Sequence, residues 1–178
     1  MMKLSKGEAT AERILDAAFR SIATKGCGTV TLRGIAEEAG VVLSQLSYHY
    51  GNKDSLFAAV LKRMQQGYMA TLDERLEARG TLSGQIMALV EYNELILKES
   101  PDTYRNFLEF FNFAMNSEAF RVEVADFIAG IAAMIESRIA RYELGGRRKG
   151  RFFGGGGHAL HPLCYVRNLA PASAQSGQ

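Results

Sequence analysis

Cysteine, proline and long apolar runs are all scarce in this sequence of 178 residues. Two cysteines, Cys27 and Cys164, are too few for a disulfide framework, so we expect a reducing, cytoplasmic setting. No stretch approaches the ~18 consecutive apolar residues of a membrane span, and the first residues lack the apolar core of a secretion signal. The lack of such a span means that no membrane partner is expected. Three prolines and few alternating β-branched runs predict an all-α protein.

The overall balance is that of a folded globular chain, with 47% apolar and 22% charged residues. The net charge of +2 conceals an asymmetry. Residues 1–63 hold nine Lys or Arg against six Asp or Glu, and residues 64–144 hold seven against thirteen. Residues 145–178 hold five basic residues and no acid. A basic N-terminal part followed by an acidic body indicates a chain that meets a polyanion with one end.

The segment from Thr31 to Tyr50 predicts two short helices around a turn. Four apolar residues share one face of the first helix at helical spacing: Leu32, Ile35, Ala36 and Ala39. Thr31 stands at the N-cap position, and Gly40 stands where a helix must end in a left-handed conformation. Two helices joined by a short turn containing glycine form a helix-turn-helix over residues 31–50.

The second helix of this motif has one apolar side, on which Leu46 and Tyr50 point the same way. Its other side carries hydrogen-bonding groups without negative charge: Ser44, Gln45, Ser47, Tyr48 and His49. Amide and hydroxyl groups of this kind suit base edges and phosphates in a DNA groove. The alternative is a pair of short helices around a glycine with no DNA function.

Segments on both sides of the motif support the DNA-binding interpretation. An apolar stripe from about Ala9 to Lys25 predicts a scaffold helix that ends at a glycine-containing linker. After the motif, Asn52 is a candidate N-cap, and Asp54 lies in the first turn of a long helix. Lys53 has the wrong sign for a helix start, which makes sense if a phosphate lies nearby. An ordinary solvated lysine is the alternative.

Four further helices are predicted at about 53–79, 82–99, 101–116 and 117–144. The third of them is apolar nearly all round, which fits either a packed core or a cavity for an apolar or aromatic ligand. Flexible methionines could supply adaptable cavity walls. The candidate pocket residues are Met64, Met87, Phe107, Phe110, Phe111 and Met134.

From Gly145 the chain contains eight of its eighteen glycines and two of its three prolines, so we expect an irregular or disordered tail. His158, His161 and Cys164 match no standard zinc spacing, so no metal site is predicted. No catalytic triad or phosphate-binding glycine loop falls on an ordered element. We therefore expect neither a cofactor nor an enzyme.

Residues from about Ala9 to Met64 resemble the DNA-binding domain of the TetR family of bacterial transcriptional regulators. The resemblance is carried by TLRGIAEEAGV, from Thr31, and by YHYGNKDSL, from Tyr48. It implies a dimeric repressor that leaves its operator when a small molecule enters the helical C-terminal domain. It also implies which side chains face the major groove or adjoining phosphates: Thr31, Arg33, Ser44, Gln45, Ser47, Tyr48, His49 and Lys53.

The sequence departs from the family pattern in two places. Val42 stands where a polar residue commonly caps the second helix of the motif. The glycine-rich tail stands where the family has a long apolar helix that completes a four-helix dimer interface. A shift of reading frame after about residue 144 would account for the loss of acids and periodicity, a hypothesis that sequencing of the gene tests.

We therefore predict an all-α protein in three parts. Residues 1–52 form a DNA-binding domain, residues 53–144 a helical ligand-binding and dimerisation domain, and residues 145–178 the tail. The predicted function is sequence-specific DNA binding as a ligand-responsive repressor, with an operator, a small apolar or aromatic effector and a second copy of the chain as partners. The alternative is a helical small-molecule binding or interaction module whose DNA regulation is impaired by an incomplete dimer interface.

Overall fold

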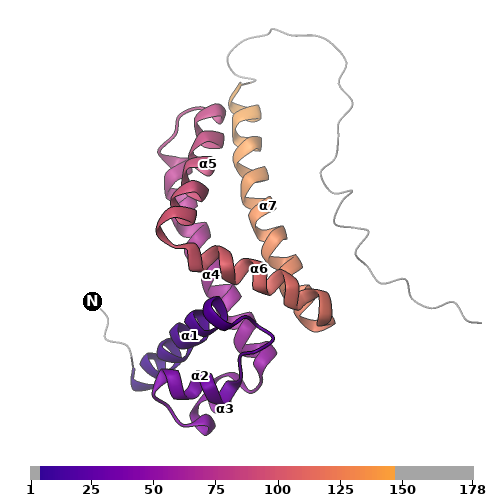
Figure 1. Cartoon of the computed structure of the whole chain (residues 1–178). Helices are drawn as coiled ribbons and strands as arrows, with labels where there is room; N and C mark the ends of the chain where they lie inside the picture. Colours follow the sequence, from indigo (N-terminus) through magenta and orange to yellow (C-terminus); the bar gives the residue numbers. More distant parts are fainter. Residues whose placement is uncertain (1–4, 147–178) are drawn as a thin grey trace, which may run out of the picture.

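The computed structural model describes residues 5–146, and every regular element within them is an α-helix (Figure 1). The helices are α1 (Lys6–Lys25), α2 (Leu32–Ala39), α3 (Leu43–Tyr50), α4 (Lys53–Glu77), α5 (Leu82–Glu99), α6 (Pro101–Asn116) and α7 (Glu118–Gly146). The predicted all-α class is confirmed. Among the described residues, no helix combines the length and apolar character needed to cross a membrane.

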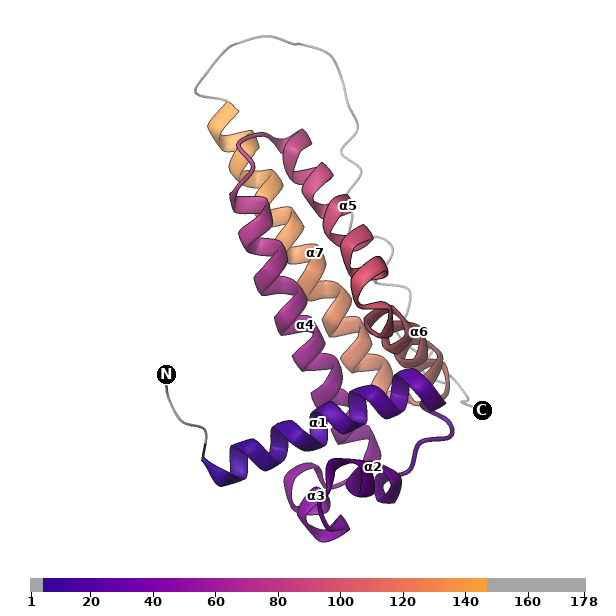
Figure 2. The same ribbon diagram turned by 60° about the vertical axis from the view of Figure 1, so that its left-hand side comes forward.

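The helices divide into an elongated bundle and a small group at its foot (Figure 2). Helices α4, α5 and α7 run side by side along the bundle, and α4 packs against both of the others. Helix α1 crosses the foot of the bundle, with α2 and α3 below it. Helix α6 packs on α1, α5 and α7, so it joins the bundle to the group of short helices.

Most helices begin where the sequence predicts, because side chains satisfy their first free N–H groups. Thr31, Asn52 and Thr81 each accept a hydrogen bond from the backbone N–H three residues on, at 3.1, 2.8 and 3.1 Å. Pro101 occupies the first turn of α6, where its missing N–H costs nothing. Gly40 ends α2 with φ of +65°, in the left-handed conformation that the sequence predicts.

Three helix boundaries differ from the prediction by two residues or more, and one of them is the end of α4, at Glu77 rather than near Arg79. Helix α1 begins at Lys6 rather than near Ala9, because Ser5 and Glu8 form a capping box with reciprocal side-chain to backbone hydrogen bonds. Helix α7 runs to Gly146, so the predicted tail overlaps its last two residues, and 147–178 lies outside the described residues. The division of the chain after residue 52 falls between α3 and α4 and remains a prediction.

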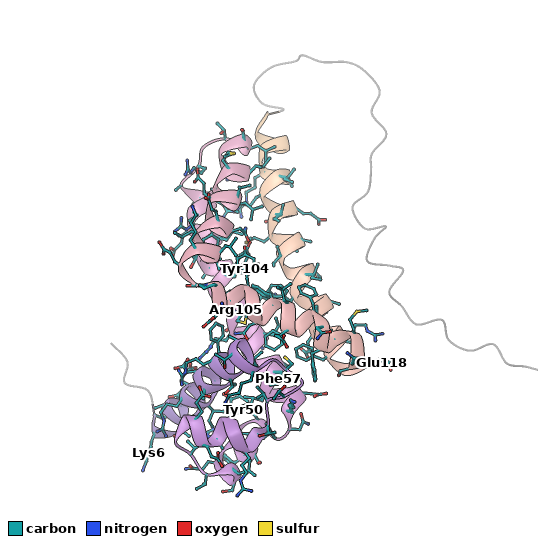
Figure 3. The ribbon with its side chains drawn as sticks, in the orientation of Figure 1. Lys6, Tyr50, Phe57, Tyr104, Arg105 and Glu118 are labelled. Carbon is teal, nitrogen blue, oxygen red and sulfur yellow. The ribbon has the colours of Figure 1, made fainter. Side chains whose placement is uncertain are left out.

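The larger apolar cluster runs without a break from the short helices into the bundle. Phe57 on α4 is fully buried at its centre, and its ring lies 6.0 Å from Phe110 and 5.4 Å from Phe113, both on α6 (Figure 3). Leu46 of α3 and Ile35 of α2 belong to the same cluster. The position of α3 is therefore set by residues that also hold α4 and α6 together.

Helix α6 corrects the two interpretations given to its phenylalanines. Phe110 and Ala114 are buried, but Leu108 is 70% and Met115 76% exposed, and Phe111 is 43% exposed. The helix packs on one side only, and within residues 5–146 nothing covers its other side. Part of this helix is therefore an outward apolar face, which is neither packed core nor cavity wall.

Candidate nucleic-acid interface

Helix α3 is held by one buried side chain and one tyrosine hydroxyl. Leu46 has no exposed surface, and the Tyr50 hydroxyl donates to the Ala11 carbonyl of α1 at 3.1 Å. Burial of this ring raises the pKa of Tyr50, so the hydroxyl keeps its proton and remains a donor. Tyr50 lies between the short helices in Figure 3. The predicted inner side of α3 is thus confirmed.

The outer face of α3 carries the hydrogen-bonding side chains that the sequence places there. Tyr48 is 86% exposed, Ser44, Gln45 and Ser47 are exposed, and His49 is half-buried. The Tyr48 and His49 rings meet edge to face, with centroids 5.4 Å apart. A face of amide, hydroxyl and imidazole groups without a carboxylate can approach both base edges and phosphates.

Val42 leaves the start of α3 without a hydroxyl or carboxylate cap. The Gln45 side-chain oxygen instead accepts from the Val42 N–H at 3.4 Å, while its amide group lies on the exposed outer face. Val42 is 61% exposed and sits at the edge of the same face. Gln45 therefore both closes the helix start and remains available to a ligand of α3.

A hollow of about 400 Å³ lies between the first turn of α1 and α3. Its walls combine four residues predicted for the interface, Ser44, Gln45, Tyr48 and His49, with the start of α1. Lys6 and Thr10 supply the α1 side, and Figure 3 shows Lys6 projecting from the N-terminal end of that helix. Sequence reasoning missed Lys6, because nothing in the local pattern reveals that the first turn of α1 faces α3.

Helix α2 contributes two of the predicted residues. The Thr31 hydroxyl is engaged as the N-cap, accepting from the Gly34 N–H, which leaves its own proton free for a further bond. Arg33 and Glu37 form an exposed ion pair at 3.6 Å, one turn apart on the same helix. An exposed pair of this kind contributes little to stability, so Arg33 can exchange Glu37 for another anion at low cost.

Lys53 lies at the first position of α4, next to the Asn52 cap. It is half-buried, and its ammonium group lies 5.4 Å from the centroid of the Phe57 ring. Among residues 5–146 no carboxylate forms a salt bridge with it. The cation is held near a helix N-terminus without a neutralising partner, an arrangement that suits a phosphate.

Helix α2 is fixed against α1 by Glu38, which the sequence analysis does not single out. Its carboxylate accepts from the Ser21 hydroxyl at 2.6 Å and from Arg20 Nε at 3.2 Å, and Lys25 lies 3.9 Å away. Ser21 is buried, so the contact lies partly out of water. These bonds set the angle between α1 and α2, and hence the frame on which α3 rests.

The structure does not gather the six predicted pocket residues around one cavity. Met64 is buried and lines a cleft of about 490 Å³ between α1, α4 and α5. Phe107 and Phe110 pack among the aromatic rings of the larger cluster, and Met134 packs on the smaller one. Met87 and Phe111 are exposed. Within residues 5–146 no set of three His, Cys, Asp or Glu is placed to hold a metal, and the tail histidines lie outside that range.

These elements define a helix-turn-helix protein, whose second short helix rests on α1 and presents an uncharged hydrogen-bonding face. Residues 14–60 match the bacterial regulatory proteins of the tetR family. This match and the similar proteins described next support a TetR-family regulator, that is, a DNA-binding transcription regulator rather than an enzyme.

Similar proteins agree with this assignment. The HTH-type transcriptional regulator BetI of Brucella canis is 24% identical over 176 residues, which cover 98% of this chain and 87% of BetI. A TetR-family member from Streptomyces coelicolor is 28% identical and superposes with a TM-score of 0.59. The match covers 72% of this chain and 75% of the Streptomyces chain. FadR of Bacillus subtilis, solved with stearoyl-CoA, shares the fold at 17% identity and a TM-score of 0.68, over 80% of this chain and 75% of FadR.

Proposed function

We propose that this regulator represses transcription by inserting α3 into the major groove of an operator, and that a small effector molecule releases it. The observation that carries the proposal is the contrast between the two sides of α3. Leu46 is completely buried behind the helix, and Tyr48 is 86% exposed in front of it. A largely exposed aromatic ring with a hydroxyl group, on a helix anchored by a buried leucine, is suited to recognition.

The predicted residues fall into two groups, one proposed to contact base edges and one proposed to contact phosphates. Ser44, Gln45, Tyr48 and His49 line the hollow between α3 and α1, and these four are proposed to meet base edges. The remaining residues surround that face and are proposed to contact phosphates: Thr31, Arg33, Ser47 and Lys53. For Lys53 the support is its unneutralised ammonium group at the N-terminus of α4. Lys6 joins the proposed set from the other side of the hollow.

A repressor of this kind needs two copies of α3, spaced by a turn of DNA of about 34–36 Å. The uncovered apolar face of α6 and α7 supports a dimer, because Leu108, Met115 and Val122 are each more than half exposed. We propose a homodimer that uses this face. Sedimentation equilibrium tests it, and a monomer at the concentration that saturates the operator would contradict it.

The effector is proposed to be a small molecule with an apolar or aromatic body that binds in the helical bundle. Two observations support this proposal: the Bacillus subtilis protein was solved with stearoyl-CoA, whose acyl chain is apolar, and the 490 Å³ cleft offers space for a small molecule here. The regulator is proposed to act in the cytoplasm, where bacterial DNA lies.

The experiment begins with selection of bound duplexes from a random DNA pool by the full-length protein. Affinities for the selected duplex are then compared for Gln45→Ala, Tyr48→Ala and Lys53→Ala, with Lys98→Ala on α5 as the control for loss of a lysine. We expect the first two to lose affinity for the selected sequence by roughly 5- to 100-fold. Lys53→Ala weakens binding to any duplex and lowers the salt dependence by about one charge.

Unchanged affinity in Gln45→Ala and Tyr48→Ala, with both variants folded, would show that α3 is not the recognition element. Equal losses in Lys98→Ala and Lys53→Ala would remove the special role of Lys53. Failure to enrich any duplex sequence would contradict sequence-specific binding itself.

A further inference from the structure

We infer that Gln45 of α3 reads guanine rather than adenine in the operator, and that the backbone N–H of Val42 imposes this choice. The inference rests on the proposed insertion of α3 into the major groove. It adds the base that one side chain selects and the group that determines the selection. Val42 is then a positioning residue, because its N–H acts on the base only through Gln45.

A glutamine side chain can read a base edge in two ways, because its amide carries both an acceptor and a donor. When both are free, the amide bonds adenine at N6 and N7, which are a donor and an acceptor side by side. Guanine presents two acceptors in the same place, N7 and O6, and suits a group that only donates. The choice between the two purines therefore depends on whether the carbonyl oxygen of Gln45 is free.

In this structure the carbonyl oxygen of Gln45 is engaged. Gln45 Oε1 accepts from the backbone N–H of Val42 at 3.4 Å. A backbone N–H can only donate, so the amide must turn its oxygen toward Val42 and its NH₂ group away from it. Gln45 is exposed and lines the hollow between α1 and α3. The group that remains available to a base is therefore the NH₂ group, which only donates.

The Val42 N–H has no other hydrogen-bond partner among residues 5–146. The carbonyl of Val42 is used differently, because it accepts from the N–H groups of Gln45 and Leu46 at 3.0 and 3.3 Å. The bond from the Val42 N–H to Gln45 is long, so water competes with it in the free protein. DNA bound to this face displaces that water, and an N–H that loses water without gaining another acceptor is destabilising. Gln45 therefore keeps its oxygen on Val42 when DNA binds.

The same bond makes adenine the poorer partner. To accept from adenine N6, Gln45 Oε1 must leave the Val42 N–H, which exchanges one hydrogen bond for another and leaves a desolvated donor unpaired. Guanine requires no such exchange, because the NH₂ group donates to N7 or O6 while Oε1 stays in place. Gln45 also lies in the first turn of α3, where the positive end of the helix dipole favours acceptor groups.

The first experiment finds the base that Gln45 contacts. Full-length wild type and Gln45→Ala are compared by fluorescence anisotropy on the selected duplex, and on a panel in which each base pair in turn is replaced by the other three. The position at which Gln45→Ala equalises the affinities is the one that Gln45 reads. We expect guanine there in the wild type, preferred over adenine by about 5- to 100-fold.

The second experiment removes the Val42 N–H by Val42→Pro. Proline has no N–H, and the φ of Val42 is −78°, which lies within the range of proline. Val42→Ala is the matched control, because alanine also shortens the side chain but retains the N–H. We expect the ratio of guanine to adenine affinity to fall about fivefold or more in Val42→Pro, and to stay within about twofold of the wild type in Val42→Ala.

A change at Gln45 keeps the inference testable if Val42→Pro does not fold, which circular dichroism melting determines. Gln45→Arg replaces the amide by a group that only donates, as the amide is inferred to do. A guanine preference at the same position in the wild type and in Gln45→Arg supports the inference. A wild type that prefers adenine there, with guanine preferred only in Gln45→Arg, overturns it.

Three results overturn the inference: a wild-type preference for a base other than guanine at the position that Gln45 reads, a guanine preference unchanged in folded Val42→Pro, or an equal loss of preference in Val42→Ala. Each is distinguishable from failure of the proposed function. If no duplex sequence is enriched, or if Gln45→Ala alters no base preference, recognition of DNA by α3 fails. If Gln45→Ala equalises one position and guanine is not preferred there, only the assignment of the base fails.

Discussion

Replacement of Leu46 by alanine tests how α3 is held. Helix α3 has eight residues and no side-chain cap from Val42, and Leu46 is its one fully buried side chain. A helix this short is not stable alone in water, so its position depends on that contact. A Leu→Ala change at a completely buried site leaves a cavity in the cluster shared by α1, α2 and α4, and it costs about 3 kcal/mol.

A loss of that size lowers the Tm of a chain of this length by roughly 6–12 °C. Far-ultraviolet circular dichroism melting measures it, with Leu97→Ala as the matched control. Leu97 is 58% exposed on α5, so the same deletion there costs no more than about 0.5 kcal/mol. We also expect Leu46→Ala to lose operator affinity below its Tm, because α3 loses its fixed angle. Equal Tm values for the two variants, or full operator affinity in Leu46→Ala, would refute this account of how α3 is held.

Replacement by alanine at two glycines should have opposite effects on stability. Gly40→Ala should destabilise the protein by about 1 kcal/mol, because φ is +65° at this position. Gly67→Ala in the interior of α4 should stabilise it by about 0.5–1 kcal/mol, because the added Cβ meets nothing within 4 Å. Thermal melting of both variants checks the two signs, and a gain in stability at Gly40 would contradict the left-handed turn. Burial and the nearby Glu109 carboxylate raise the pKa of the Cys27 thiol to about 12, so in a Cys164→Ser background the thiol should not react with a disulfide reagent at pH 8 until the protein unfolds. Because the fold favours the neutral thiol, the contribution of Cys27 to the free energy of unfolding is complete below the unfolded pKa of about 9 and is lost as the pH rises toward 12. Rapid labelling of the native protein, or stability that rises between about pH 9 and 12, would contradict this account. Glu109→Ala leaves the buried Cys27 N–H, which now donates to that carboxylate at 2.7 Å, without a partner and should cost about 1–3 kcal/mol in a denaturant titration, whereas a cost near zero would show that water replaces the carboxylate.

Local patterns were enough to predict the elements of the fold. Thr31, Gly40 and Asn52 act within one helical turn of their own positions, so cap and turn chemistry place the ends of α2 and the start of α4 correctly. Helical periodicity also predicts correctly that Leu46 faces inward and Tyr48 outward. Both kinds of inference need only the residues of a single helix.

Contacts between residues far apart in the sequence could not be predicted in this way. The Glu38–Ser21 bond, the Arg63–Asp16 pair and the approach of Lys6 to α3 depend on how helices cross, which no single helix reveals. The predicted pocket failed to assemble for the same reason. Residue type made methionine and phenylalanine the candidates, but the cleft is lined by residues of α1, α4, α5 and the start of α6 that only the packing brings together.

The binding preference of the intact regulator tests the central claim most directly. Fluorescence anisotropy measures the affinity for a selected duplex and for a scrambled duplex of equal length and composition, at one salt concentration, for the wild type and for Tyr48→Ala. We predict that the wild type prefers the selected duplex by about 10³-fold or more, and that Tyr48→Ala loses much of this preference while it retains the wild-type Tm. Equal affinity of the wild type for both duplexes, or a preference unchanged in Tyr48→Ala, would contradict recognition of DNA by the exposed face of α3.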